Sequence, residues 1–414
     1  MDEKEITFVK KMALTIDISH EKTSGALKNG RWSDLPMDIL MLVTQLLNLA
    51  DHVRISITCK SWQRTAPSFL SSKSPALLFI ENQSSNFFDP LSKKICVTYI
   101  PELLDATFHY SKDGWLLLSQ NNNQFQFFFF NPFTNEKINL PKTNQSSLIN
   151  CGGSGKLEAV VASFSAPPTS QDCMVLVILA MTSHHPNRLP YTVHICSHGN
   201  SNLEWSRFSR RRDVDIFEDP LGLQPTYYKN TLYFGGAFYH LNKSGTLAIT
   251  GFFKNSTAKS IDLVKKPTGL CPLSKHDDCY LVESQGEILS IFCQGNQTQV
   301  FRLDRSALFR SQPVEKWIKV RSLGDNILFL GQLTSLSTVV RGKGGKIFFS
   351  AFQRGCNDPV FYSFQTKEFN REFSSREEHA KQIWVDPNFV FKARREEKSF
   401  NFAWLFGKAK LTIN

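Results

Sequence analysis

Several groups of residues in this 414-residue chain could do chemistry, but each departs from the spacing that its chemistry needs. Residues 152–156 (GGSGK) look like part of a phosphate-binding loop, whose pattern requires glycine at position 150 and serine or threonine at position 157. Because Asn150 and Leu157 occupy these positions, we interpret the segment as a glycine-rich turn. The sequence also contains neither a G-x-S-x-G nucleophile motif nor an H-E-x-x-H metal motif.

Histidine and cysteine residues form two candidate sets of metal ligands. The first set is Cys271, His276, Cys279 and Cys293, and the second is His194, Cys196 and His198. The first set contains no C-x-x-C pair and has no usual zinc spacing, so it predicts no metal site. The three residues of the second set would share one face of a strand, which zinc could use, but we prefer to interpret this segment as a surface loop.

Paired carboxylates are the remaining candidates for general acid and base chemistry. Glu377-Glu378 and Glu396-Glu397 are adjacent in the sequence, so their side chains diverge on a strand or on a helix. We interpret both pairs as solvated charge. The sequence therefore predicts no catalytic residue, no metal site and no cofactor.

A unit of three short helices is predicted between residues 33 and 66. Ser33 and Asp34 are capping residues, Pro36 suits a first helical turn, and apolar residues then recur at helical spacing. A second start signal lies at Asp51, and the third helix must end before Pro67. So small a unit exposes more apolar surface than it can bury alone, which predicts a partner or docking on the rest of the chain.

From Ala76 onward the pattern changes to short apolar runs separated by Gly, Asn, Asp, Ser and Pro. No long amphipathic helix interrupts these runs, so alternating βαβ units are not expected. The runs predict strands at 76–80, 115–118, 125–130, 231–236, 280–284, 288–292, 327–331 and 347–352.

The same region contains a loose internal repeat. Strand ends that lead into polar turns recur near residues 88, 130, 196, 241, 303 and 364. Units of roughly 40–60 residues suit a β-propeller of about six four-stranded blades with loops of variable length. A β-sandwich built from the same strands is the alternative.

The expected organisation is a multidomain, mainly β protein. It has a flexible leader at 1–30, a helical unit at 31–67, a linker at 68–75 and a propeller-like domain at 76–400. A tail at 401–414 is a candidate for closing the propeller.

Charge and hydropathy limit the compartment and the partners. The net charge is +11, but the densest basic run, residues 207–212, is followed at once by acidic residues. A solvated loop is expected there, so nucleic acid is a poor candidate partner. An acidic protein partner explains the net charge as well as nucleic acid would.

The longest apolar run, residues 174–181, is too short to cross a membrane. Nine widely spread cysteines without an export signal indicate the nucleus or the cytoplasm.

Residues 35–62 (LPMDILMLVTQLLNLADHVRISITCKSW) resemble an F-box. The match includes Leu35-Pro36, Asp51 and the segment from Thr58 to Trp62, with Asp38 standing where glutamate is usual. The resemblance implies that an apolar helical face binds a Skp-type adaptor, which connects the chain to a cullin scaffold. The residues expected to contact the adaptor are Leu35, Pro36, Ile39, Leu40, Val43, Leu46, Leu47, Cys59 and Trp62.

The remainder of the chain resembles the C-terminal domain of unknown function 295 (DUF295) of plant F-box proteins, which is related to kelch-like β-propellers. Together with the F-box, the matching motifs span most of residues 32–385. They include Gly114–Leu118, Asn131–Thr134, Tyr280–Ser284, Val300–Asp304, Trp317–Val320, Leu328–Gly331 and Gly345–Phe349.

These resemblances imply a non-catalytic, substrate-recognition subunit of an SCF-type E3 ubiquitin ligase. The F-box would hold the chain on the ligase, and the propeller would hold an unidentified protein target near activated ubiquitin. One alternative is an interaction scaffold that binds the adaptor without delivering a substrate. Another is a propeller enzyme or lectin, which would need a convergent acid, base or metal cluster at the central channel.

Overall fold

The computed structural model describes residues 74–387, with gaps at 92, 123, 143–155, 183–190, 199–202, 209–227, 243, 253–257, 275–276, 307–315, 351–359 and 372–380. The predicted helical unit at 31–67 and the predicted tail at 401–414 lie outside these residues. Among the described residues, the model has no helix that is long and apolar enough to cross a membrane.

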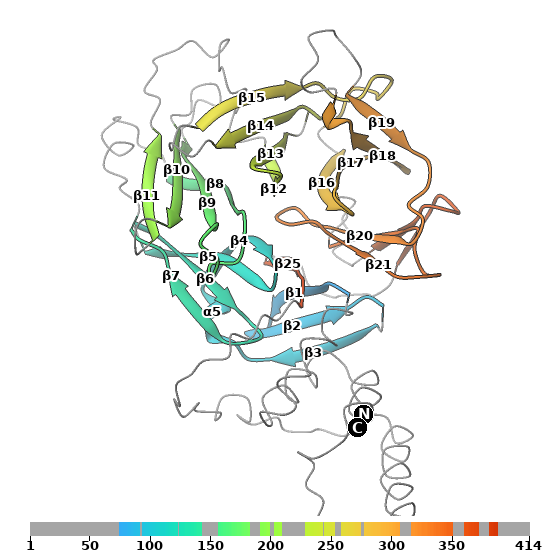
Figure 1. Ribbon diagram of the computed structural model, residues 1–414. Coiled ribbons are helices and arrows are strands. Elements are labelled where there is room, and N and C mark those ends of the chain that lie inside the picture. The colour runs from blue at the N-terminus through green and yellow to red at the C-terminus, as the bar shows by residue number, and fades with distance from the viewer. Residues whose placement is uncertain are drawn as a thin grey trace, which may run out of the picture. The chain divides into compact units, whose positions relative to one another are not determined.

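Six sheets form the blades of a ring, five of them antiparallel and one mixed (Figure 1). From the axis outward, blade 1 contains β25 (Gln382–Val385), β1 (Ala76–Glu81), β2 (Ser84–Asp89) and β3 (Lys94–Thr98). Blade 2 contains β4 (Ala106–Lys112), β5 (Trp115–Asn122), β6 (Gln124–Asn131) and β7 (Glu136–Asn139). Blade 3 contains β8 (Lys156–Phe164), β9 (Met174–Thr182), β10 (Tyr191–His198) and β11 (Leu203–Phe208).

The other three blades continue the ring. Blade 4 contains β12 (Tyr228–Phe234), β13 (Ala237–Asn242), β14 (Leu247–Phe252) and β15 (Ala258–Val264). Blade 5 contains β16 (Asp278–Ser284), β17 (Glu287–Gln294), β18 (Gln297–Leu303) and β19 (Trp317–Val320). Blade 6 contains β21 (Leu336–Val339), β20 (Asn326–Leu330), β22 (Lys346–Phe349), β23 (Val360–Ser363) and β24 (Glu368–Arg371).

This architecture confirms the predicted six-bladed propeller, and the sandwich alternative is wrong. Contacts between the innermost strands run around the ring, from β25 to β4, β8, β12, β16 and β21. The one helix in the described part of the chain is the four-residue α5 (Pro101–Leu104), between blades 1 and 2.

The apolar runs are continuous, not alternating, because the middle strands of a blade are covered by other parts of the propeller on both faces. Leu116, Leu117 and Leu118 in β5 are all fully buried, as are Phe127 to Phe130 in β6. A strand that is buried on both faces reads as a continuous hydrophobic run, not as an alternating one. In the run FFFF at 127–130, Phe127 and Phe129 pack in the cluster between blades 2 and 3, and the alternate residues Phe128 and Phe130 are buried on the other face of the sheet.

Tight turns join the inner strands to the second strands. In Asp113-Gly114 both residues have positive φ, at 50° and 79°, and the same holds for Gly235-Gly236 and Gln285-Gly286. Two-residue hairpin loops of this kind require positive φ at both central positions, which glycine adopts without strain. The turns therefore let the inner strands β4, β12 and β16 pair directly with β5, β13 and β17.

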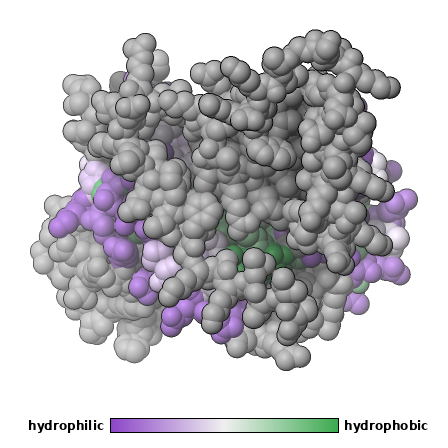
Figure 2. Space-filling model, turned by 90° about the horizontal axis from the view of Figure 1, so that it is seen from below, coloured by the Kyte–Doolittle hydropathy of each residue, from purple (hydrophilic) through white to green (hydrophobic). Residues whose placement is uncertain are grey.

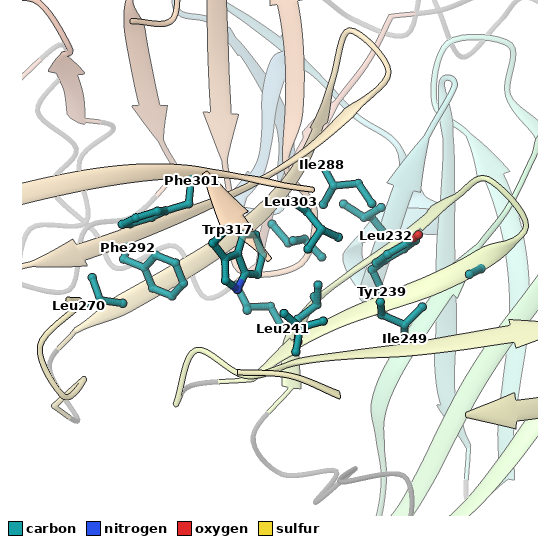
Figure 3. Close-up of a cluster of buried hydrophobic side chains, with 14 residues drawn as sticks. Leu232, Tyr239, Leu241, Ile249, Leu270, Ile288, Phe292, Phe301, Leu303 and Trp317 are labelled. Atoms are coloured by element: carbon teal, nitrogen blue, oxygen red, sulfur yellow. The ribbon is translucent and has the colours of Figure 1, made fainter. Parts of the chain in front are cut away.

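The hydrophobic core lies between neighbouring blades. Figure 3 shows the cluster between blades 4 and 5, where Trp317 lies among leucine and phenylalanine side chains. The Trp317 indole N–H donates to the carbonyl oxygen of Lys265 at 2.8 Å, so the buried ring keeps its polar group paired. Similar clusters join blades 2 and 3, blades 5 and 6, and blades 6 and 1.

Blade 1 closes the ring, because it combines the two ends of the described chain. β25 pairs antiparallel with β1, and Leu77 lies opposite Trp384. Trp384 is fully buried and donates its indole N–H to the carbonyl oxygen of Leu330 at 2.9 Å. Its ring also lies edge-on to Phe329, with centroids 5.1 Å apart. One tryptophan thus connects blade 1 to blade 6.

A hairpin inside blade 6 points towards the middle of the ring (Figure 1). β20 pairs antiparallel with β21 and parallel with β22, so blade 6 has five strands instead of four. The hairpin tip, residues 331–335, contains Thr334, which is only 2% exposed. The backbone N–H of Ser111 in β4 donates to the Thr334 hydroxyl at 2.9 Å. The tip therefore joins blade 6 to blade 2 across the axis.

We expect Trp384→Ala to lower the free energy of unfolding by about 3–5 kcal/mol, because it leaves a cavity at the contact between blades 1 and 6 and removes a buried hydrogen bond. Chemical denaturation of the full chain measures the change. The control is Ile318→Ala on the outer strand β19, where the side chain is 42% exposed. A loss below about 1 kcal/mol for Trp384→Ala would contradict the closure described here.

Candidate functional site

The nine residues predicted to contact the adaptor all precede residue 74 and lie outside the described residues. Their roles stay predictions. The candidate site within the described residues is the axis of the propeller, where the innermost strands of different blades meet.

Polar side chains near the axis bond to one another across the blades. The Ser111 hydroxyl donates to the carbonyl oxygen of Trp384. The Asn230 side-chain amide donates to the Cys279 carbonyl oxygen at 3.2 Å, and the Ser335 hydroxyl donates to the Asn230 amide oxygen at 3.5 Å. These are neutral hydroxyl and amide groups that already have partners. They hold blades in register, and they offer no group that could exchange a proton at neutral pH.

Charged groups gather where the inner strands end. Lys112, the last residue of β4, donates to the Ser165 carbonyl oxygen at 2.8 Å, and its ammonium lies 5.8 Å from the centre of the Tyr233 ring. Asp113 follows it in the turn, and Asp386 follows the closing strand β25. Burial, together with the nearby Asp113 carboxylate, raises the pKa of Asp386 from 3.8 to about 6.

The Asp113 carboxyl is affected in the same direction. Burial raises its pKa, and the Lys112 ammonium opposes that rise. The Asp386 carboxyl can therefore bind a proton near pH 6, and the two carboxylates together can bind a basic group. No group of three His, Cys, Asp or Glu side chains within the described segments could hold a metal ion.

Two histidines lie in inner strands: the partly buried His109 in β4, the innermost strand of blade 2, and the buried His240 in β13, the second strand of blade 4. Burial lowers the pKa of His109 to about 4 and that of His240 to about 3. His109 Nε2 lies 2.7 Å from the Ser119 hydroxyl, and His240 Nδ1 lies 3.0 Å from the Thr231 hydroxyl. Both rings are therefore neutral at pH 7 and act as hydrogen-bonding core residues. Sequence reasoning did not single them out, because no motif surrounds them.

The structure corrects the interpretation of residues 194–198 as a surface loop. They belong to β10, which pairs with β9 and β11. His194 is 2% exposed and lies edge-on to Trp205, with ring centroids 6.3 Å apart. Cys196 packs in the apolar cluster between blades 2 and 3. The prediction failed because an interior strand with polar residues looks like a loop when its neighbours in the sheet are unknown.

The other chemical candidates are separated or lie outside the described residues. His276, residues 152–155 and the paired glutamates fall in gaps or beyond residue 387. The Cys279 thiol donates to the Asn242 carbonyl oxygen at 3.1 Å, whereas Cys293 accepts a weak contact from the Thr298 hydroxyl at 3.8 Å. These two thiols thus have different partners.

We expect Asp386→Asn to stabilise the protein above pH 6. The folded-state pKa of Asp386 is about 6, above the ordinary value of 3.8, so the ionised carboxylate destabilises the fold. This penalty is fully present above pH 6, declines as the pH falls from 6 to 3.8, and is absent below that range. The free energy of unfolding should rise by about 3 kcal/mol at pH 7.5 and by about 1 kcal/mol at pH 4.5.

Denaturation curves of the full chain at the two pH values measure this difference. Glu368→Gln, which removes an exposed carboxylate at the start of β24, is the control and should change stability little at either pH. A destabilising effect of Asp386→Asn at pH 7.5 would show that the charge is favourable in the fold.

Comparisons with known proteins identify both parts of the chain. Residues 87–379 match the family described as the KIB1-4 beta-propeller, and residues 32–71 match the F-box domain. The relatives are proteins of Arabidopsis thaliana. F-box/kelch-repeat protein At1g57790 is 27% identical over 373 residues, which cover 86% of this chain and 94% of that protein. F-box protein At3g56470 is 25% identical over 366 residues, which cover 86% of this chain and 88% of that protein.

The propeller match covers most of the chain and includes strands of all six blades, while β1 and the closing strand β25 lie outside it. The F-box match coincides with the segment in which the sequence predicts three helices. The chain therefore belongs to the family of plant F-box proteins that carry a KIB1-4 β-propeller.

Proposed function

We propose that this protein is the substrate-recognition subunit of an SCF-type E3 ubiquitin ligase. The observation that carries the proposal is the presence on one chain of an F-box at 32–71 and a β-propeller at 87–379. The F-box would bind a Skp-type adaptor and, through it, a cullin. The propeller would bind a protein target that is still to be identified.

The mechanism is proximity, so the chain itself need not carry a catalytic residue. Apolar F-box side chains, among them Leu35 and Leu40, would insert into a groove of the adaptor and supply most of the binding energy. A target held on the propeller then meets activated ubiquitin at a high effective concentration. Two features of the structure support a binding role for the propeller: its axial polar groups are engaged with one another, and its buried histidines are neutral.

The propeller offers a rigid support for recognition loops. The core clusters between the blades fix the strands, and the connecting segments between them vary in length. Binding residues commonly lie on loops that a rigid scaffold positions. The net charge of +11 favours an acidic protein surface as the target, and the proposal places the complex in the nucleus or the cytoplasm.

We expect the double substitution Leu35→Ala/Pro36→Ala to abolish capture of the adaptor and the cullin by the full chain. Loss of central apolar contacts should weaken adaptor binding at least about tenfold, because buried anchors of this kind contribute about 2 kcal/mol or more. A pull-down probed for both partners measures the effect. Ile318→Ala on β19 is the control and should leave capture unchanged.

The result that would contradict the proposal is a normal chain that binds neither partner, or a double variant that binds both as well as the normal chain. A second readout separates a ligase subunit from a scaffold. The proteins held by the propeller should persist longer in cells when cullin activity is inhibited. If their lifetime does not depend on the cullin, the chain is an interaction scaffold that binds the adaptor without delivering a substrate.

A further inference from the structure

The outermost strand of blade 1 exposes an apolar stripe. Ile95, Val97 and Tyr99, at alternate positions in and just after β3, are 39%, 63% and 60% exposed. They are three of the five large hydrophobic side chains that are exposed in the described part of the chain. Figure 2 views the propeller from the side on which β3 lies in Figure 1, and hydrophobic surface is visible there.

The stripe continues a buried face of the same sheet. Ile95 lies opposite Phe88 of β2, and Phe88 is buried in the cluster between blades 6 and 1. Side chains of paired residues lie on the same face of a sheet, so the apolar face extends outward from the blade contact to the rim. The edge strand β3 therefore carries the end of a hydrophobic layer that the described residues do not cover.

Charged residues usually protect an edge strand. In β3 the only charged residue is Lys94 at its start, and residues 95–99 (ICVTY), which carry the stripe, contain no charge. The edge strands β7 (EKIN) and β24 (EFNR) carry two charged residues each, and β19 (WIKV) carries Lys319 next to its exposed Ile318. An edge segment without charge and with an apolar face is a template for pairing with another strand.

The chain itself contains a segment that fits this edge. Residues 400–406 (FNFAWLF) place Phe400, Phe402, Trp404 and Phe406 at every second position, which is the pattern of a strand with one aromatic face. Such a run is unfavourable in water, because each aromatic side chain gains a few kcal/mol on burial.

The reach of the chain allows this pairing. The described residues end at Pro387, two positions after the closing strand β25 of the same blade. Three strand spacings of roughly 4.8 Å separate β25 from β3, which is about 14 Å. The 12 residues from 388 to 399 can span roughly 40 Å when extended, so residues 400–406 can reach β3 in either direction.

We propose that residues 400–406 pair with β3 as an additional outer strand of blade 1 and cover the stripe of Ile95, Val97 and Tyr99. The aromatic face of the segment then continues the apolar face of the sheet. The segment does not close the ring, which β25 already does. Blade 1 would gain a fifth strand, and the uncharged edge of β3 would no longer be available to other chains. This inference does not depend on the ligase role.

Hydrogen–deuterium exchange of the full chain tests the pairing from both sides. With Phe402→Asp/Trp404→Asp, the amides of β3 should exchange at least about fivefold faster than in the normal chain, because their outer partners are removed. With Val97→Lys, the amides of residues 400–406 should exchange faster by a similar factor. Ile318→Lys alters a comparable exposed apolar residue on the edge strand β19 and should leave both segments unchanged.

Val97→Thr provides a milder variant in case Val97→Lys does not fold, and it should give a smaller change in the same direction. Sedimentation at two protein concentrations accompanies the exchange measurement. Equal exchange of β3 with and without Phe402→Asp/Trp404→Asp would overturn the proposal. So would protection of β3 that depends on protein concentration, because it would assign the stripe to a second copy of the chain.

Discussion

The structure depends on the pairing of β25 with β1, which joins residues some 300 positions apart in the chain. Closing a loop of that length costs on the order of 5 kcal/mol in chain entropy. Backbone hydrogen bonds between the two strands and the burial of Trp384 against blade 6 offset this cost. Without closure, blades 1 and 6 would each expose an apolar face, so the ring behaves as one structural unit.

The same requirement explains the character of the axis. Inner strands from different blades approach one another there, and any polar group that they bury needs a partner. Ser111, Thr334 and Asn230 supply these partners for one another's blades. The tip of the β20–β21 hairpin takes part in these contacts, because Thr334 bonds to blade 2 and Ser335 to blade 4. A scaffold of this kind fits the proposed role of holding a target in place, while the F-box segment is proposed to bind the adaptor.

Much of the fold was predictable from the sequence, because strands that are buried within the blades have apolar sequences. The runs at 115–118 and 280–284 are examples, and they lie in β5 and β16. The repeat was less exact: the anchor at 241 falls in the second strand of its blade, whereas the anchors at 130 and 303 fall in the third. The closing strand QIWV was missed, because a strand of four residues is too short to show a sequence pattern and its partner strand β1 is distant in the sequence. The axial site was not predictable either, because its hydroxyl and amide groups meet only through tertiary structure.

The central claim is that adaptor attachment and target binding belong to separate parts of the chain. Its most direct test compares the proteins captured by the full chain, by Leu35→Ala/Pro36→Ala and by Trp384→Ala. The account predicts that the first variant loses the adaptor and keeps the proteins bound by the propeller, whereas Trp384→Ala keeps the adaptor and loses those proteins. Loss of the same proteins in both variants would contradict it.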